Sequence, residues 1–323
     1  YEPALLLPIG FGAILVNIPF TSVLTQVTDG VTQHGALSIL YEAGILTELF
    51  PLLIFIAIGA MIDFTPLLQN PRLLLFGAAA QFGIFFTMTV ASLFGFSLKE
   101  AASIGVIGTA DGPTSIYVAS RFAKNLLGPI SVAAYSYMSL VPIIQPPVIR
   151  LLTTKKERRI RMDYHEKKIP KLVKILFPII VTLIAGLIAP VSLALIGFLM
   201  FGNLIRECGV LERLSNAAQK ELANIVTLLL GITIGSTMTA EKFLRVDTLL
   251  ILGMGLVAFI FDTAGGVLFA KFLNLFLKHK INPMVGAAGI SAFPMSARVV
   301  QKMGQQEDPS NCLLRHAASA SLA

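Results

Sequence analysis

Long hydrophobic runs separated by short polar or charged segments make up most of this chain. Several of them, such as residues 73–96 and 249–276, reach the roughly 17–25 residues that a helix needs to cross a bilayer. No series of short alternating strands suggests a barrel. The pattern predicts an all-α, polytopic membrane protein. The expected membrane segments are residues 3–18, 46–62, 73–96, 98–119, 128–149, 175–189, 192–205, 225–239 and 249–276.

Two stretches between these hydrophobic runs are too polar to cross a membrane. Residues 21–38 predict a polar connection with a turn at Asp29-Gly30, and residues 206–224 predict a charged, amphipathic segment on the surface.

Composition supports a membrane protein and excludes a nucleic-acid-binding one. Of the 323 residues, 55% are hydrophobic and 13% are charged, whereas about 25% are charged in a soluble domain. The net charge is +7, but nine of the 25 Lys and Arg residues lie within residues 155–174. This clustering predicts a cytoplasmic loop, with a patch for anionic lipid or an acidic partner as the alternative.

A polar, glycine-rich interruption breaks the apolar segment 98–119. Its sequence, Gly108-Thr109-Ala110-Asp111-Gly112-Pro113-Thr114-Ser115, puts one carboxylate beside glycine and proline, the residues that most readily unwind a helix. Ionisable residues inside membrane segments are costly and often mark ion pathways. We therefore expect a broken helix with an ion site at Asp111.

A similar interruption occurs near the other end of the chain, within residues 286–296. The spacing Gly-x4-Pro-x-Ser occurs at 108–115 and again at 289–296, and residues 56–61 resemble residues 232–237. The distance from Gly59 to Gly108 is 49 residues, and the equivalent distance in the second half is 54. The shared order favours a duplicated unit, and matching broken helices in two halves are typical of transporters.

Hydroxyl, amide and backbone oxygens around one carboxylate suit a hard cation such as Na⁺. The candidate ligands are Thr109, Asp111, Thr114, Ser115, Asn282, Ser291 and Ser296. An isolated buried carboxylate binds a cation or takes a proton, so the site could exchange Na⁺ for H⁺. Asp262 lies in a segment without an interruption and either joins this site or pairs with a polar neighbour.

Longer motifs extend over nearly the whole chain. They are Gly59-Ala60-Met61-Ile62-Asp63-Phe64, Gly77-Ala78-Ala79-Ala80-Gln81-Phe82-Gly83, Ala110-Asp111-Gly112-Pro113-Thr114, Ala133-Ala134-Tyr135-Ser136-Tyr137-Met138, Gln145-Pro146-Pro147 and Asn282-Pro283-x2-Gly286. They resemble the β subunits of the sodium-pumping biotin-dependent decarboxylases, which include oxaloacetate, methylmalonyl-CoA and glutaconyl-CoA decarboxylases. The resemblance implies a subunit in a bacterial cytoplasmic membrane that decarboxylates carboxybiotin, exports Na⁺ and consumes a proton.

The resemblance also assigns roles to individual residues. It implies a metal site at Asp111, Asn282, Gly286 and Ser291, to which the oxygen chemistry of the interruption adds Thr109 and Thr114. It also implies catalytic residues at Tyr137, Ser291 and Arg298. Arg298 would also hold the carboxylate of carboxybiotin in its planar fork. The implied cofactors are Na⁺ and carboxybiotin presented by a carrier domain. The implied partners are a carboxyltransferase α subunit, a biotin carrier protein or domain and a small single-span γ subunit, in an oligomer.

We expect one integral membrane domain over residues 1–323, truncated at both ends. Its repeat halves, about 1–150 and 175–323, would be joined by the basic loop 151–174, and the resemblance implies that the repeats are inverted. The carboxy-terminal sequence differs from the family pattern. Residues 316–321 occupy the position where the family has a Gly-Asn or Ala-Asn followed by a further helix. The alternative function is a secondary Na⁺/H⁺ or carboxylate transporter without enzymatic activity.

Overall fold

The computed structural model describes residues 2–19, 21–28, 31–69, 71, 74–162, 168–243, 245–277, 280–290, 292 and 295–322. Within these residues the chain is helical apart from one small hairpin, and six helices are long and apolar enough to cross a membrane. The number rises to seven if a bent helix pair is one further span. The prediction of an all-α, polytopic membrane fold is confirmed.

The chain divides into two compact units, each built from segments of both halves. Unit 1 comprises Tyr1–Asp63, Ala119–Ser131 and Ile169–Val246, and unit 2 comprises Phe64–Val118, Val132–Lys168 and Asp247–Ala323. The units therefore do not divide at the basic loop 151–174 that separates the two sequence halves.

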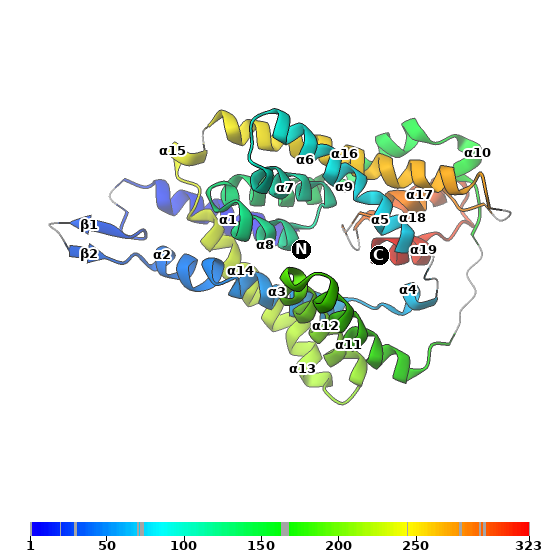
Figure 1. Cartoon of the computed structure of the whole chain (residues 1–323), viewed down its shortest axis with the longest axis horizontal. Coiled ribbons are helices and arrows are strands. Elements are labelled where there is room, and N and C mark those ends of the chain that lie inside the picture. The colour runs from blue at the N-terminus through cyan, green and yellow to red at the C-terminus, as the bar shows by residue number, and fades with distance from the viewer. Residues whose placement is uncertain are drawn as a thin grey trace. The chain divides into compact units, whose positions relative to one another are not determined.

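Unit 1 contains the amino-terminal helices and the middle of the chain (Figure 1). Its elements are α1 (Glu2–Asn17), β1 (Gln26–Thr28), β2 (Val31–Gln33), α2 (Ala36–Leu40), η1 (Tyr41–Leu46), α3 (Leu49–Met61), η4 (Lys124–Leu126), α11 (Lys171–Ile188), η5 (Pro190–Ser192), α12 (Leu193–Cys208), α13 (Glu212–Ala217), η6 (Ala218–Leu222), α14 (Ala223–Gly235) and α15 (Ala240–Phe243).

Unit 1 is held together by pairs of helices that meet at glycine. Helix α1 packs against α14, and α12 packs against α3. A Cβ atom on Gly12 would lie 2.5 Å from the carbonyl oxygen of Ile232, and one on Gly59 would lie 1.8 Å from that of Leu199. The two backbones can therefore approach this closely only because no side chain separates them.

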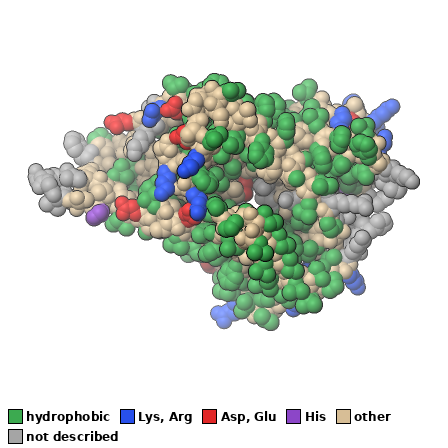
Figure 2. Space-filling view, viewed as in Figure 1, with side chains coloured by type: hydrophobic (Ala, Val, Ile, Leu, Met, Phe, Trp, Pro, Cys, Tyr) green, Lys and Arg blue, Asp and Glu red, His purple; other side chains and the backbone are tan. Residues whose placement is uncertain are grey.

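The outer surface of the helix pair α11 and α12 is largely hydrophobic (Figure 2). Only 6% of the residues of α11 are buried within the protein, and Leu183, Leu187 and Ile188 are all more than half exposed. Such a helix suits a lipid environment, where apolar side chains face hydrocarbon instead of water.

Unit 2 contains both sequence interruptions. Its elements are α4 (Thr65–Gln69), α5 (Leu74–Ala80), α6 (Phe82–Leu93), α7 (Leu98–Gly105), η3 (Val106–Thr109), most of α8 (Gly112–Phe122), most of α9 (Leu127–Leu152), α10 (Lys155–Arg158), α16 (Val246–Leu273), α17 (Met284–Ala287), α18 (Met295–Glu307) and α19 (Leu314–Ser321).

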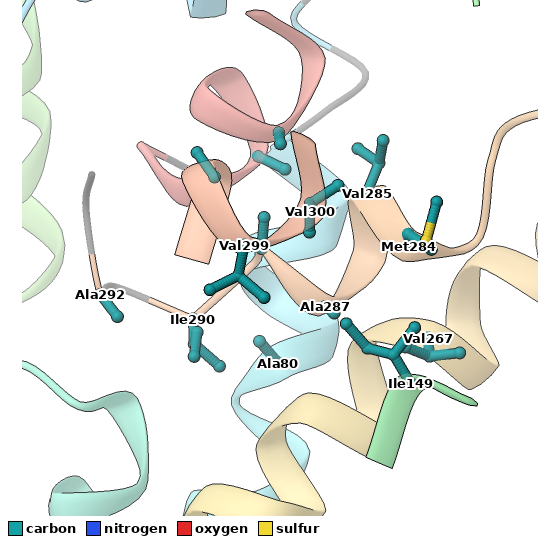
Figure 3. Packing of buried hydrophobic residues seen from close by; sticks show 14 of the residues in the cluster. Ala80, Ile149, Val267, Met284, Val285, Ala287, Ile290, Ala292, Val299 and Val300 are labelled. Carbon is teal, nitrogen blue, oxygen red and sulfur yellow. The ribbon is translucent and has the colours of Figure 1, made fainter. Parts of the chain in front are cut away.

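One buried hydrophobic cluster joins the helices of unit 2. It includes Val267 of α16, Met284 and Val285 of α17, and Val299 and Val300 of α18, with α5 and α9 contributing at its edge (Figure 3). Ala110 of the first interruption and several residues of the second, among them Ile290 and Ala292, also belong to it. The cluster therefore brings both interruptions into one core.

One local prediction needs correction, and two are refined by the structure. The segment predicted to lie on the surface, 206–224, is divided: residues 206–208 end α12, whereas α13 and η6 run without a break into α14 and form one candidate span, Glu212–Gly235. Helix α3 lies within the span predicted at 46–62, and a bend of 59° separates it from residues 36–46. At this bend Glu48 has a left-handed φ of 63°, and its carboxylate pairs with Arg121 at 3.1 Å. The polar connection 21–38 contains the β1–β2 hairpin, and its turn at 29–30 lies outside the described residues.

The glycine contact in unit 1 can be tested with two substitutions in the same helix. Gly12→Ala should destabilise the protein by about 2 kcal/mol or more, because the new methyl group would overlap the backbone of α14. Gly10→Ala should be neutral or stabilise by up to about 1 kcal/mol, since its Cβ would meet open space and alanine favours helix. Thermal unfolding in detergent measures both, and equal effects would contradict the contact.

Candidate functional site

The first interruption separates α7 from α8. Helix α7 ends at Gly105, a single 3₁₀ turn follows over Val106–Thr109, and Ala110 then adopts the left-handed conformation with φ 50° and ψ 38°. A left-handed alanine is strained by about 1–3 kcal/mol and persists only where its surroundings fix it. The predicted broken helix is therefore present, and its corner lies one residue before Asp111.

Asp111 forms the amino-terminal cap of α8. Its Oδ2 accepts a hydrogen bond from the Thr114 hydroxyl at 2.6 Å, and its Oδ1 accepts one from the Thr114 amide at 3.3 Å. The Ser115 hydroxyl donates to the Asp111 carbonyl at 2.9 Å. The carboxylate thus satisfies an amide that the helix leaves without a partner, and it carries negative charge at the positive end of the helix dipole.

Three elements pack closely around this corner. A Cβ on Gly112 would overlap the ring of Tyr135 on α9, and one on Gly105 would lie 2.7 Å from the carbonyl oxygen of Ile84 on α6. A Cβ on Gly108 would lie 2.8 Å from the Ala258 methyl group on α16. The glycines of the interruption are therefore explained by close packing as well as by unwinding.

Tyr137 lies on α9 two residues beyond Tyr135. Its hydroxyl donates to the carbonyl of Leu252 on α16, and its ring contacts the backbone of Gly255. In this conformation the hydroxyl joins two helices, so its predicted catalytic role remains a prediction.

The second interruption follows the short helix α17. Gly286 of α17 and Gly266 of α16 are in backbone contact, since a Cβ on Gly266 would lie 2.0 Å from the Gly286 carbonyl oxygen. The buried Gln145 amide on α9 donates to the Ala287 carbonyl and to the Ser296 hydroxyl, both at 2.8 Å. Gln145 therefore bridges the two sides of the interruption, between α17 and the start of α18.

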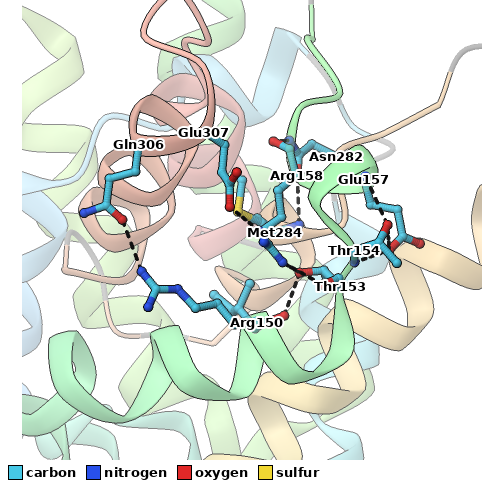
Figure 4. A network of polar contacts seen from close by, with 10 residues as sticks. Arg150, Thr153, Thr154, Glu157, Arg158, Asn282, Met284, Gln306 and Glu307 are labelled. Atoms are coloured by element: carbon cyan, nitrogen blue, oxygen red, sulfur yellow. Dashed lines mark hydrogen bonds and ion pairs between the residues drawn. The ribbon is translucent and has the colours of Figure 1, made fainter.

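Asn282 attaches residues 155–161, here called the basic segment, to the start of α17 (Figure 4). Its side-chain amide donates to the carbonyls of Arg158 at 2.8 Å and Ile160 at 2.9 Å, and its Oδ1 accepts the Met284 amide at 3.1 Å. The residue is fully buried. All its polar groups are thus used within the protein in this conformation.

Ion pairs fix the same segment to the end of α18. Arg158 pairs with Glu307, and Arg161 pairs with Asp308, both at 2.7 Å. The hydrogen bond from Arg158 lowers the pKa of Glu307, and those from Arg161 and Ser310 lower the pKa of Asp308 to about 2. Both carboxylates therefore stay ionised near neutral pH. Lys271 adds bonds to the Leu152 carbonyl at 3.0 Å and to Glu157 at 3.2 Å.

The structure brings some of the predicted site residues together and separates others. Thr109, Asp111 and Thr114 lie within the first interruption, and the Thr109 hydroxyl donates back to the Val106 carbonyl at 2.8 Å. Gly286 lies in backbone contact with α16, and Asn282 lies beside the basic segment. Ser291 lies outside the described residues.

Arg298 lies on the exposed face of α18. Its neighbours in sequence, Ala297 and Val299, are buried, whereas Arg298 itself is exposed and has no ion pair or hydrogen bond among the described residues. Its guanidinium is therefore available to a ligand.

Sequence reasoning missed the residues that anchor the interruptions. From the sequence, Gln145 is identified only as part of a Gln-Pro-Pro motif, and Tyr135 only as part of the motif at 133–138. A polar residue directly before two prolines inside an apolar run was a usable signal for Gln145. Nothing local in the sequence indicated that Lys271 and Glu307 would fasten the basic segment.

The carboxylate, hydroxyl and backbone oxygens at the first interruption are of the kind that a hard monovalent cation prefers. Among the described residues no group of three or more His, Cys, Asp and Glu could hold a metal ion together. An ion site here would therefore depend on one carboxylate supplemented by neutral oxygens, which suits weak, reversible binding.

These features define a multi-pass helical membrane protein with two interrupted helices in one unit, the architecture of ion-coupled transport proteins. The chain belongs to the family of Na⁺-transporting oxaloacetate decarboxylase beta subunits, whose sequence profile matches residues 1–323. The family resemblance drawn from the motifs is confirmed.

Individual relatives agree with this family. The chain is 51% identical to the methylmalonyl-CoA decarboxylase subunit beta of Propionigenium modestum and 52% identical to the glutaconyl-CoA decarboxylase subunit beta of Acidaminococcus fermentans. It is 44% identical to the oxaloacetate decarboxylase beta chain of Klebsiella pneumoniae. The alignments cover all of this chain and 86%, 84% and 87% of the respective relatives. The protein is thus an integral membrane subunit of the Na⁺-transporting decarboxylase kind.

The anchoring role of Asn282 predicts the behaviour of the basic segment. Asn282→Asp should expose this segment, because a carboxylate cannot donate to the two carbonyls, and losing buried hydrogen bonds costs about 1–3 kcal/mol. Limited proteolysis with trypsin at residues 155–161 should then be at least about fivefold faster. Asn17→Asp, which removes an amide donor to Met238 in unit 1, should leave this rate unchanged. Equal rates in the wild type and Asn282→Asp would contradict the anchor.

Proposed function

We propose that this protein decarboxylates carboxybiotin, presented by a carrier domain of a partner subunit, and couples that step to Na⁺ export. The main support is the single carboxylate at the corner of a broken helix, in a chain that belongs to a family of Na⁺-transporting decarboxylase subunits. Na⁺ enters from the cytoplasm, binds at Asp111, and decarboxylation changes the side of the membrane that the site faces.

The energetics of such coupling are reasonable. Moving one Na⁺ outward against the membrane potential costs about 2.3 kcal/mol per 100 mV. An exergonic bond cleavage can drive this step if the ion and carboxybiotin bind to alternative states of the same unit.

Tyr137, Ser291 and Arg298 are the proposed groups for the chemical step, with Arg298 binding the carboxylate. The exposed, unpaired Arg298 fits such a ligand, because a planar guanidinium donates two parallel hydrogen bonds to a carboxylate. The proposed partners are a carboxyltransferase α subunit, a biotin carrier and a small single-span γ subunit.

The proposed ion site predicts the effect of Asp111→Asn. Asparagine caps helices as well as aspartate does, so the variant should insert and fold normally while losing the negative charge. Na⁺ stimulation of carboxybiotin decarboxylation by the reconstituted complex should be abolished. A variant that kept near wild-type Na⁺ activation would contradict the site, whereas one that failed to fold would show that capping needs the charge.

Arg298→Lys tests whether this side chain binds the carboxylate or only anchors α18 by its charge. Lysine keeps the charge but loses the planar fork, so turnover of free carboxybiotin should fall at least about tenfold, or about 1.4 kcal/mol. Binding of ²²Na⁺ in the absence of biotin should remain nearly unchanged. Normal turnover would make Arg298 an anchor, and complete absence of carboxybiotin turnover in the wild type would favour a transporter without enzymatic activity.

A further inference from the structure

Asp262 is a buried carboxylate that the proposed ion site does not use. It lies within α16 and is 1% exposed, and neither of its side-chain oxygens has a hydrogen bond of good geometry among the described residues. The donors that approach it are the backbone amides of Gly83 and Ile84, at the start of α6. Asp111, by contrast, accepts two hydrogen bonds from Thr114. The two aspartates of unit 2 therefore occupy chemically different environments.

Two glycines on neighbouring elements make room for the Asp262 side chain. A Cβ on Gly83 of α6 would lie 2.2 Å from its Oδ1, and a Cβ on Gly108 of η3 would lie 2.2 Å from its Oδ2. The backbones of α6 and α16 are also close here, because a Cβ on Gly83 would lie 2.4 Å from the Asp262 amide nitrogen. The carboxyl group thus fills a space between three elements.

A further polar side chain lies on the same face of α6. Thr87 is one helical turn beyond Gly83, is fully buried, and its hydroxyl has no hydrogen-bond partner among the described residues. Other helical threonines, such as Thr89 and Thr233, donate to the carbonyl four residues earlier. The α6–α16 contact therefore contains an unpartnered carboxylate and an unpartnered hydroxyl.

No described cationic group neutralises Asp262. Helix α6 and turn η3 carry no ionisable side chain, and the ionisable groups of the other adjoining elements are engaged or distant along their elements. They are Lys99 and Glu100 in the first turn of α7, Asp111 after η3, Tyr137 on α9, whose hydroxyl bonds to Leu252, and Asp247 and Lys271 near the ends of α16.

We propose that Asp262 is a proton-binding site of unit 2 and is a neutral carboxylic acid in this conformation. An ionised carboxylate without a partner is strongly disfavoured in an apolar interior. A bound cation would need several oxygen ligands, but the groups that face the carboxylate are the backbones of Gly83 and Gly108, and the backbone amides of Gly83 and Ile84 are donors. A proton satisfies the carboxylate without any further ligand.

The proton links this site to the first interruption. Gly108, which contacts Asp262, lies three residues before Asp111 in the chain. Loss of the proton would place a charge between α6, η3 and α16 and would favour a rearrangement of the turn that precedes Asp111. The consequence for Na⁺ rests on the proposed function, whereas the protonation itself does not.

Infrared spectroscopy of the complete reconstituted complex tests the protonation directly. The wild type should show the carbonyl band of a protonated carboxylic acid at neutral pH, sensitive to D₂O exchange, and Asp262→Asn should lack it. Asp111→Asn and the control Asp247→Asn, in the first turn of the same helix, should both retain the band. Absence of a band that Asp262→Asn removes would overturn the proposal.

Stability and Na⁺ activation provide independent readouts. Asp262→Asn should fold like the wild type, since asparagine resembles the neutral acid, and failure to fold would overturn the proposal. In the wild type the Na⁺ concentration for half-maximal activation should depend on pH, and this dependence should weaken at least about threefold in Asp262→Asn. An unchanged dependence would overturn the link to Asp111. Loss of activation in Asp111→Asn tests the proposed function separately.

Discussion

Backbone contact between helices at glycine is the constraint on which both units depend. In unit 1, Gly59 meets α12 and Gly12 meets α14, and in unit 2, Gly266 meets Gly286. Helices in a bilayer gain little from the hydrophobic effect against one another, because lipid tails are equally apolar, so close van der Waals contact must hold them. These contacts also position the interruptions. The contact with Gly266 fixes α17, and the contact of Gly108 with α16 fixes η3.

Interrupting a helix in an apolar environment frees backbone groups that water cannot satisfy there. Each interruption here has a polar side chain that meets this need. Asp111 accepts the Thr114 amide at the start of α8, and Gln145 donates to the Ala287 carbonyl at the end of α17. Asn282 does the same for the carbonyls of the basic segment. The same side chains that suit an ion site therefore also maintain the broken backbone.

Sequence reasoning predicted the membrane segments and both interruptions because these depend on local pattern. Hydrophobic run length gave the spans, and the glycines and proline around Asp111 gave the corner at Ala110. It failed at residues 212–224, where charged side chains suggested a surface helix although the backbone continues into α14. The partners of Gln145 and Asn282 could not be predicted, since they are 142 and 124 residues away.

The internal repeat remains a prediction. Residues that it aligns make similar contacts in the structure. The repeat aligns Gly59 with Gly235, and each of them meets the backbone of a helix from the other half. Gly59 meets α12 at Leu199 and Asn203, and Gly235 meets α1 at Ile9 and Gly12. The carbonyls that follow, of Ile62 and Met238, each accept a hydrogen bond from an asparagine on that helix. These contacts join segments of both sequence halves within unit 1.

Capping of α8 and the proposed cation binding at Asp111 are compatible because they use different lone pairs of the Asp111 and Thr114 oxygens. A carboxylate offers about four acceptor positions, and Thr114 occupies two of them with its amide and hydroxyl hydrogens. The Thr114 hydroxyl gives its hydrogen to Asp111, so its oxygen lone pairs remain free to face a cation. The cap would thus orient two oxygens for the proposed cation before it binds. No described side chain donates to Asp262, and the proposed proton would stabilise its burial.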